Sequence, residues 1–406
     1  MPPLLSILIP TRNRAALLKY AIQSALAIPS DSIEIIVSEN HGSDDGFAVC
    51  QSFSDARLRV LRPETPLPMH ENFEFLLKQS RGQWVTFVGD DDAIMPHAAD
   101  HLSYLSQKYP QAEAILSPRA YYFWDGVQAQ YGPQSVRVSF SPREQWCDSK
   151  KKLRQTLDGK LNYIHLPQMY SGGFHRRSLI NRVLRSQNGV YFKSVSPDAY
   201  AALMACVHTY RYLETGIPMS WVGSSPHQAL KAGQNQVKNR EQDFYGLHTD
   251  DSLTAHRALG DLKVVNFTLH FYETYISAIP ITSYHELSLD RVRRVYLSVV
   301  RDLRRKGNKE AEIQKLSADL GFEVPPEAGI RARLAGGSDY AARKWTKLSR
   351  RVGERFASRL PRARERFRYG FESTSHEEFP HIQSADHLLA QAYSQWLEHR
   401  KAVDSR

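Results

Sequence analysis

The sequence predicts an α/β fold with a doubly wound, mostly parallel sheet, followed by a largely helical C-terminal region. Short apolar, β-branched runs alternate with segments whose apolar residues recur at helical spacing. Such alternation is typical of parallel sheets covered by helices on both faces. Polar residues also follow several of the predicted strands directly. Because open sheets of this kind bind ligands beyond the carboxyl ends of their strands, we expect a ligand site along that rim.

The first half of the predicted sheet begins with a strand at 6–9, which leads into a polar turn at 11–14. Apolar residues at helical spacing then predict a helix over 17–26, and a second strand follows at 33–37. These elements form a βαβ unit with a right-handed crossover. A third, shorter strand is predicted at 58–61.

The fourth predicted strand ends in three adjacent acids. A helix over 71–80 leads to the apolar run at 84–88, after which come Asp90, Asp91 and Asp92. Like charges a few ångströms apart repel strongly in a partly desolvated crevice. A divalent cation carrying a diphosphate would neutralise them, and a solvated acidic turn is the alternative. The position at a strand end favours the ligand site.

The segments after this strand are less regular. Residues 113–124 predict one strand, and the polar stretch at 126–165 is interpreted as an insertion. Two glycines in the run at 170–173 permit close approach of the backbone to a ligand, although they also suit a plain turn. Residues 217–222 predict a late extended segment, and a last helix is expected over 384–399.

Composition narrows the class of protein. The 406 residues are 42% hydrophobic and 24% charged, which is typical of a globular chain with a sizeable core. The start of the chain has no signal-peptide features and no apolar run is long enough to span a bilayer, so we expect a cytoplasmic protein. The three distant cysteines argue against a disulfide framework and a thiolate metal site. The net charge of +10 implies an acidic partner, whether nucleotide, membrane surface or nucleic acid.

Three segments resemble the family 2 glycosyltransferases of GT-A fold. They are SILIPTRNR at 6–14, EIIVSENHGSD at 34–44 and GQWVTFVGDDD at 82–92, in the order and spacing of the family and each at a strand end. The branch similar to abequosyltransferases of O-antigen assembly is the most similar. The resemblance covers about residues 4–125 and is weaker to about 235. It implies a nucleotide-diphospho-sugar donor and inversion at the anomeric carbon.

The resemblance also implies a division of the first part of the chain. Residues 1–125 would form the nucleotide-sugar-binding half of a GT-A domain and 126–245 its acceptor-side half. Helical periodicity and an excess of cationic residues predict that 246–406 form a helical, basic C-terminal region. The positions that match the nucleotide-binding part of the family are Pro10, Thr11, Arg12, Arg14, Glu39, Asn72, Arg81, Asp90 and Asp91.

Several of these residues have alternative roles. Arg12 and Arg14 could be solvated loop charges, and Asn72 and Arg81 suit a helix surface or cap. Glu39 stands where the family usually has an aspartate, which leaves the identity of the base open. Asp91 lies between the two residues to which the Asp-X-Asp motif gives roles.

A metal ion is the implied cofactor. Asp90 and Asp92 take the ends of the Asp-X-Asp motif, as ribose-side and metal-side carboxylates. Mg²⁺ or Mn²⁺ prefers oxygen ligands and keeps coordination sites for phosphate oxygens. His227, after the last predicted strand, is a candidate third ligand or diphosphate contact, and a structural loop histidine is the alternative.

Asp198 is the candidate general base. An inverting transfer needs a carboxylate that takes the proton of the attacking hydroxyl, and family members place an acid at the start of a helix in this region. Asp198 follows Pro197 at the start of a predicted helix. The alternative is a structural role, because an acid in a first helical turn is favoured by the helix dipole.

The C-terminal part carries much of the positive charge. Residues 331–368 hold thirteen cationic residues against three acids, and apolar residues recur among them at helical spacing. This basic helix could pack on the domain, bind an anionic membrane that holds a lipid-linked acceptor, or bind nucleic acid. We expect no nucleic-acid binding, because no recognised module accompanies the charge.

Three functions remain open from the residues. The first is a metal-dependent glycosyltransferase acting on a glycan or lipid-linked acceptor, with peripheral binding to the inner face of the plasma membrane. The second is a catalytically inactive nucleotide-sugar-binding scaffold at the same membrane face. A nucleotidyltransferase would need a glycine-rich loop after the first strand, and the turn at 11–14 contains no glycine. The presence of Asp92 and Asp198 favours the first.

Overall fold

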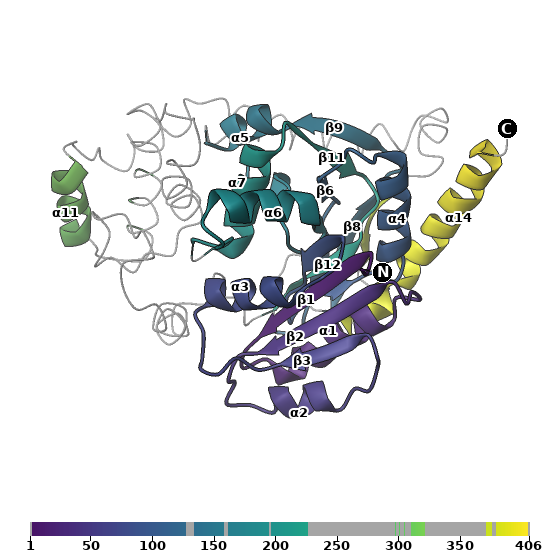
Figure 1. Cartoon of the computed structure of the whole chain (residues 1–406), viewed down its shortest axis with the longest axis horizontal. Helices are drawn as coiled ribbons and strands as arrows, with labels where there is room; N and C mark the ends of the chain where they lie inside the picture. Colours follow the sequence, from purple (N-terminus) through teal and green to yellow (C-terminus); the bar gives the residue numbers. More distant parts are fainter. Residues whose placement is uncertain are drawn as a thin grey trace. The chain divides into compact units, whose positions relative to one another are not determined.

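The computed structural model describes residues 2–126, 134–157, 161–194, 196–225, 310–320, 371–375 and 379–404, together with Leu297, Val300 and Arg304. These residues belong to two compact units. The first unit takes the described residues up to 150, from 164 to 225 and from 371 to 404, and it contains two β-sheets (Figure 1). The second unit includes α11 (Glu310–Leu320), which lies within the region 246–406 that the sequence predicts to be helical.

The larger sheet has eight strands in the order β3-β2-β1-β4-β10-β6-β11-β9. Their bounds are β1 (Leu5–Thr11), β2 (Ile33–Glu39), β3 (Leu58–Leu61), β4 (Trp84–Phe87), β6 (Ala114–Leu116), β9 (Glu144–Asp148), β10 (Gly173–Arg176) and β11 (Arg211–Thr215). The strands β1, β2, β3, β4, β6 and β11 share one direction, and β10 and β9 oppose them. The predicted mostly parallel sheet is confirmed, and the six shared carboxyl ends lie on one rim of this sheet.

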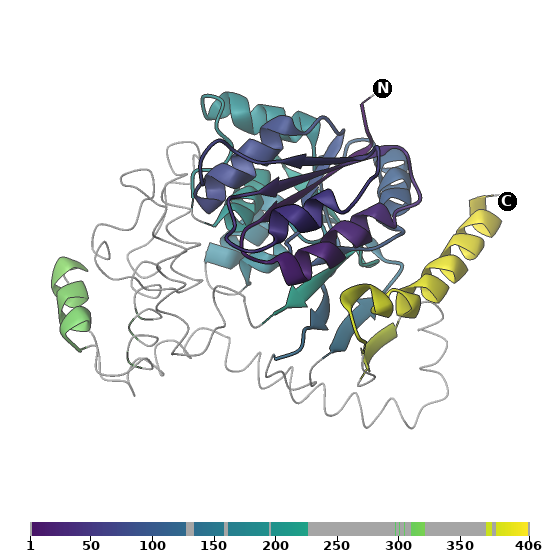
Figure 2. The same ribbon diagram turned by 90° about the horizontal axis from the view of Figure 1, so that it is seen from below.

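Helices cover both faces of this sheet, as a doubly wound fold requires. Alternate residues of β1 point to opposite faces. Ile7 and Ile9 join one core with α1 (Ala15–Leu26) and α4 (Ala98–Lys108). On the other face Phe87 stacks on Phe73 of α3 (Met69–Gln79), with ring centroids 4.4 Å apart. Figure 2 shows α1 in front of the strands that carry the site. A strand that is buried on both faces has a continuous run of apolar residues, so the strands in the first part of this sheet could be predicted from the sequence.

The second sheet was not predicted. It contains β5 (Ala93–Ile94), β7 (Ala120–Phe123), β8 (Ser135–Phe140), β12 (Ser220–Ser224) and β13 (Phe371–Ser375), in the order β13-β8-β7-β12-β5. The single strand expected over 113–124 is divided in two at Pro118, where the chain passes from β6 in the first sheet to β7 in the second. Proline cannot donate to a strand ladder, so it ends the pairing there.

The region expected to be irregular, 126–165, also contains regular structure. Within its described residues lie β8, β9 and α5 (Ser149–Leu157). The helices α2 (Gly46–Gln51) and α6 (Arg177–Ser186) were likewise not predicted, whereas the helix expected after residue 196 is α7 (Pro197–His208). Of the region 246–303, which is expected to be helical, the structure describes Leu297 and Val300, both in helical conformation, and the basic helix at 331–368 lies outside the described residues.

The described residues 371–404 belong to the first unit, whereas α11 belongs to the second. β13 pairs antiparallel with β8, and it is followed by η5 (Ile382–Ala385) and the predicted last helix, α14 (His387–Asp404). Val138 of β8 packs in one core with Leu389 and Trp396 of α14. The last helix therefore covers one face of the second sheet (Figures 1 and 2).

The structure also bears on membrane-spanning helices and on the cysteines. No helix in the described ranges is long and apolar enough to cross a membrane. Cys50, Cys147 and Cys206 are all buried and free, as their odd number and wide spacing predict.

Asp386, before α14, makes the stability of this packing depend on pH. Trp221 Nε1 donates to Asp386 Oδ1 over 2.7 Å, and burial raises the pKa of Asp386 to about 7. The folded state then binds the proton more tightly than the unfolded chain, so stability present below about pH 4 is lost as pH rises through about 7. We expect Asp386→Asn, which keeps the acceptor, to stabilise the protein by about 1–2 kcal/mol at pH 8. Urea unfolding at pH 5 and pH 8 measures the effect.

The exposed Asp125 supplies a matched control, because Asp125→Asn makes the same chemical change outside this core. For each variant, the quantity to compare is the difference between its unfolding free energy at pH 5 and at pH 8. If this difference is the same for Asp386→Asn and Asp125→Asn, the pH dependence of stability does not come from Asp386.

Candidate functional site

Three buried carboxylates lie at the carboxyl end of β4. The side chains of Asp90 and Asp91 are 13% and 8% exposed, and Asp92 is 2% exposed. Burial, together with the neighbouring carboxylates, raises the pKa of Asp90 to about 7 and that of Asp92 to about 6. The raised pKa values show that the surrounding protein does not fully compensate three negative charges.

The loop after β1 reaches this cluster, as predicted. Thr11 Oγ1 donates to Asp90 Oδ2 over 2.9 Å. Arg14 Nη1 lies 3.2 Å from Asp91 Oδ2 and 3.5 Å from Asp90 Oδ1. Burial alone would lower the pKa of Arg14, but Asp90 and Asp91 raise it above the usual range. One guanidinium thus pairs with a cluster of three acids, which leaves the group net negative when all are ionised.

Asp92 is held by hydrogen bonds from three segments of the chain. Gly223 N donates to its Oδ1 over 2.8 Å, and Gly89 N donates to its Oδ2 over 3.2 Å. The hydroxyls of Ser171 and Tyr170 also donate to this carboxylate.

A tight turn directly before β10 supplies the two hydroxyls. Ser171 has φ of 39° and Gly172 has φ of 97°, both in the left-handed region that favours glycine. This conformation lets Ser171 Oγ reach Asp92 while Ser171 N donates to Phe87 O over 2.9 Å. The sequence indicates a close backbone approach at the glycines of this run, but it does not predict Tyr170 and Ser171 as site residues.

Tyr170 links the carboxylate cluster to Asp198. Burial, followed by the charges of Asp92 and Asp91 and then that of Asp198, raises the pKa of Tyr170 well above its usual range. Asp198 lies in the first turn of α7, where the sequence predicts it. Its charge therefore acts on a hydroxyl that is bonded to Asp92, which places the candidate base in the electrostatic surroundings of the cluster.

The second sheet fixes Asp91, whose role the sequence left open. Ser225 Oγ donates to Asp91 Oδ2 over 2.5 Å, and Trp124 Nε1 donates to its backbone oxygen over 2.8 Å. A Cβ on Gly223 would lie 1.6 Å from that same oxygen, so the strand can approach only with glycine. Asp91 thus joins the acidic turn to β12 and to Arg14. These partners follow strands that the sequence did not assign to a second sheet.

Two other predicted nucleotide-binding residues lie at the carboxyl end of β2. Glu39 Oε1 accepts from Gly42 N over 2.5 Å, and its Oε2 lies 3.1 Å from Arg62 Nε. Asn72 Oδ1 accepts from Ser38 Oγ over 2.6 Å. The structure therefore brings Glu39 and Asn72 to the same rim as Asp90. Pro10 and Arg12 flank Thr11 at the end of β1.

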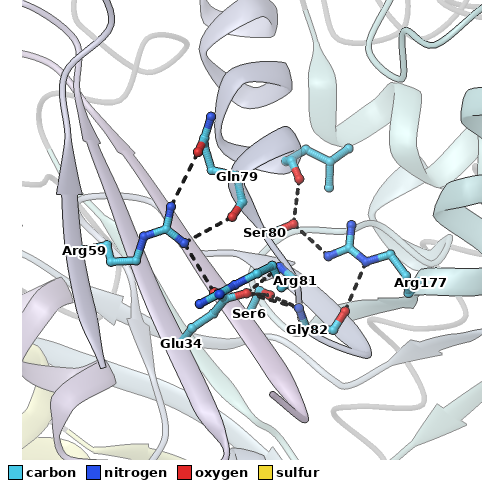
Figure 3. A network of polar contacts seen from close by, with 9 residues as sticks. Ser6, Glu34, Arg59, Gln79, Ser80, Arg81, Gly82 and Arg177 are labelled. Atoms are coloured by element: carbon cyan, nitrogen blue, oxygen red, sulfur yellow. Dashed lines mark hydrogen bonds and ion pairs between the residues drawn. The ribbon is translucent and has the colours of Figure 1, made fainter. Parts of the chain in front are cut away.

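Arg81 is not brought to this rim. It precedes β4, so it lies at the amino ends of the parallel strands, next to Glu34. Arg81 N donates to Glu34 Oε1 over 2.5 Å, and its Nε lies 3.5 Å from Glu34 Oε2. Figure 3 shows Glu34 surrounded by Arg81, Ser6 and Arg59. The length of β4 separates this network from Asp90, so the structure gives Arg81 a structural ion pair.

The metal expectation can be examined on the described part of the chain. Across these residues no group of three or more His, Cys, Asp and Glu side chains is arranged to hold a metal ion. His227, the predicted third ligand, lies outside the described residues. The incomplete compensation of Asp90 and Asp92 nevertheless suits a divalent cation, for which oxygen ligands are preferred.

Residues 6–175 match the sequence model of glycosyl transferase family 2. The match extends from β1 through the three carboxylates to the turn that holds Asp92. Residues 6–175 are therefore similar to the family 2 glycosyltransferases.

Curated relatives match the first part of the chain. The GalNAc(5)-diNAcBac-PP-undecaprenol beta-1,3-glucosyltransferase of Campylobacter jejuni is 38% identical over 109 residues, which is 26% of this chain and 34% of that protein. An uncharacterized protein of Mycobacterium tuberculosis is 33% identical over 119 residues, which is 29% of this chain and 36% of that protein. The chain thus spans about a third of the length of these relatives.

Solved structures give more distant likenesses. Staphylococcus aureus TarS 1-349 in complex with UDP-GlcNAc is 15% identical with a TM-score of 0.46, covering 87% of this chain and 92% of that one. The mannosyltransferase PcManGT from Pyrobaculum calidifontis in complex with GDP-Man and Mn²⁺ is 13% identical with a TM-score of 0.39, covering 79% and 88%.

Proposed function

We propose that this protein is a metal-dependent, inverting glycosyltransferase of cell-surface glycan synthesis, of the O-antigen or capsule type. It moves a sugar from a nucleotide-diphospho-sugar to a hydroxyl of a lipid-linked or polysaccharide acceptor. The observation that carries the proposal is the buried cluster of Asp90, Asp91 and Asp92 on the carboxyl rim of a family 2 domain, beside Thr11 and Arg14. The acceptor class is supported by the name of the Campylobacter relative. A place in the abequosyltransferase-like branch belongs to the same proposal.

The residues of the cluster would hold the donor. Asp90 and Asp92 would bind Mg²⁺ or Mn²⁺, which neutralises charge on a departing diphosphate when it is bound. Arg14 adds a fixed positive charge next to the same position. Thr11 orients Asp90, and the donors from Ser171 and Gly223 orient Asp92, so these carboxylates need no rearrangement when the donor arrives.

Asp198 would act on the acceptor. The hydroxyl oxygen of the acceptor attacks the anomeric carbon, and the bond from that carbon to the diphosphate oxygen breaks with its electron pair. The hydroxyl proton passes to the Asp198 carboxylate. Attack opposite the leaving group inverts the configuration of the anomeric carbon.

The cellular setting is part of the proposal. We place the protein in the cytoplasm, with the basic segment 331–368 against the anionic inner face of the plasma membrane, where lipid-linked acceptors are held. The support is the excess of thirteen cationic residues over three acids in this segment, which lies outside the described residues. No nucleic-acid partner is proposed.

A thermal-shift panel of nucleoside diphosphates tests the donor site. With Mn²⁺ present, we expect one base to raise the melting temperature by several degrees, because a ligand at about 100 times its Kd stabilises the folded state by about 2.7 kcal/mol. Chelation of the metal should remove the shift. The corresponding nucleotide sugar should then be turned over with release of the nucleoside diphosphate. Binding without any turnover would instead indicate the inactive scaffold, and no shift with any base would refute the donor site.

A further inference from the structure

A polar cavity of about 450 Å³ lies between the two sheets of the first unit. Leu116 and Ser117 line it from the end of β6, and Glu214 and Thr215 line it from the end of β11. Its other wall is the second sheet, with polar side chains from β7, β8 and the segment before β7. The volume lies within the roughly 300–1,000 Å³ typical of ligand pockets.

The cavity opens at the same rim as the carboxylate cluster. β6 and β11 run in the direction of β4, so their carboxyl ends lie at the same edge. Only β10 separates β4 from β6, which corresponds to roughly 10 Å at a strand spacing of about 4.8 Å. The two sites also share a wall, because Ser117 N donates to Gly172 O over 2.8 Å and the neighbouring Ser171 bonds to Asp92.

The second sheet and the segments that follow its strands contact both sites. Trp221 and Ala120 are paired across β12 and β7 and both belong to the core under α14, so the neighbouring Arg119 faces the other way, toward the cavity. At the far end of β12, Gly223 and Ser225 contact the acidic turn. The second sheet therefore forms a wall of the cavity and also helps to hold the carboxylate cluster.

The groups that line the cavity favour an anion. The charged residues that line the cavity are two arginines, Arg119 and Arg137, and one acid, Glu214. The lining therefore has a net charge of plus one when His165 is neutral. A guanidinium carries five N–H donors, and within the described residues Arg119 uses one of them, to Gln168 Oε1 over 2.5 Å. Tyr121 lies directly across the antiparallel pair from Arg137 and adds a ring and a hydroxyl to the same wall.

Ser117 is a second observation that points to a ligand. It is 2% exposed, and its Oγ has no hydrogen-bond partner among the described residues. A buried hydroxyl without a partner costs about 1–3 kcal/mol, so such groups are normally satisfied by a ligand or water. Ser117 lines the cavity on the side of the carboxylate cluster.

We propose that this cavity is an acceptor subsite that binds an anionic sugar unit, through its phosphate or carboxylate. The inference rests on the proposed glycosyltransferase function and adds the charge class of the acceptor. Arg119 and Arg137 hold the oxyanion with their planar donor groups, and Ser117 supplies a hydroxyl. Tyr121 packs against the sugar. A unit bound there lies about one sugar away from the carboxylates, so a neighbouring hydroxyl reaches the donor.

Binding of small sugars to the full chain tests the proposal. The probes are glucose 6-phosphate, glucuronate and the neutral methyl α-glucoside, followed by isothermal titration. We expect the wild type to bind one of the two anionic sugars at least tenfold more tightly than the neutral one, and the stronger of the two identifies phosphate or carboxylate. Arg119→Gln and Arg137→Gln should each weaken that binding about tenfold or more. Arg143→Gln, an exposed arginine outside the cavity, should leave it unchanged.

The nucleotide thermal shift of the same variants keeps the two proposals separate. Arg119→Gln should retain the shift of the wild type, since the cavity lies apart from the donor site. Equal binding of the neutral and anionic sugars, no binding of any probe, or binding that Arg119→Gln and Arg137→Gln leave intact would overturn the anionic subsite while leaving the donor site untouched. Absence of a nucleotide shift in the wild type would instead refute the proposed function.

Discussion

Asp90→Asn is expected to abolish most sugar transfer and to make the metal-free protein more stable above pH 7. Burial and the neighbouring carboxylates raise the pKa of Asp90 to about 7. The folded state therefore binds this proton more tightly than the unfolded chain, and the stability present below about pH 4 is lost as pH rises through about 7. Asparagine keeps the acceptor for Thr11 but removes the charge that disfavours folding.

Transfer should fall by about 10²- to 10³-fold, because the charge of Asp90 would hold the metal and the diphosphate. Urea unfolding in the presence of a chelator at pH 5 and 8 measures stability, and release of nucleoside diphosphate measures turnover. Asp31→Asn, at an exposed position, is the control for the loss of one acid. Wild-type turnover in Asp90→Asn would remove Asp90 from the site.

Asp198→Asn is expected to keep nucleotide binding and to lose transfer. An amide cannot take the proton of the acceptor hydroxyl, so kcat should fall by about 10²- to 10⁴-fold. The thermal shift with nucleoside diphosphate and Mn²⁺ should remain close to that of the wild type, because the proposed donor contacts lie on Asp90, Asp92 and Arg14. Single-turnover transfer to an acceptor, measured beside the thermal shift, separates the two steps.

Asp100→Asn is the matched control for Asp198. Asp100 is also an acid in a first helical turn, in α4, so both variants remove the same helix-dipole interaction. If Asp198→Asn changes unfolding free energy as Asp100→Asn does and retains full transfer, Asp198 has only the structural role and the base lies elsewhere.

The local pattern of the chain predicts the first part of the fold well. The strands at β1, β2 and β4 are buried on both faces, so each forms an uninterrupted apolar run that needs no knowledge of its partners. Thr11, Arg14 and Asp90 follow such runs directly, and their meeting follows from parallel strand direction alone.

The second sheet depends on pairings between distant segments. β13 joins β8 across more than two hundred residues of sequence, and β7 begins inside what reads as one continuous strand. Periodicity reports which residues are buried but not which strands pair, so Tyr170, Ser171 and Ser225 could not be assigned to the carboxylates. Arg81 shows the converse difficulty, because nearness to a motif in sequence does not tell which end of a strand a residue occupies.

The hydrogen bonds to Asp92 tie together parts of the chain that are made at different times during synthesis. Its partners come from residue 89, from 170–171 and from 223, on three separate segments. A fragment that ends at residue 125 would contain all three carboxylates yet lack most of the donors that orient them. The proposed donor site therefore depends on the tertiary fold of the whole first unit, and its nucleotide affinity should report whether the later segments have docked during folding.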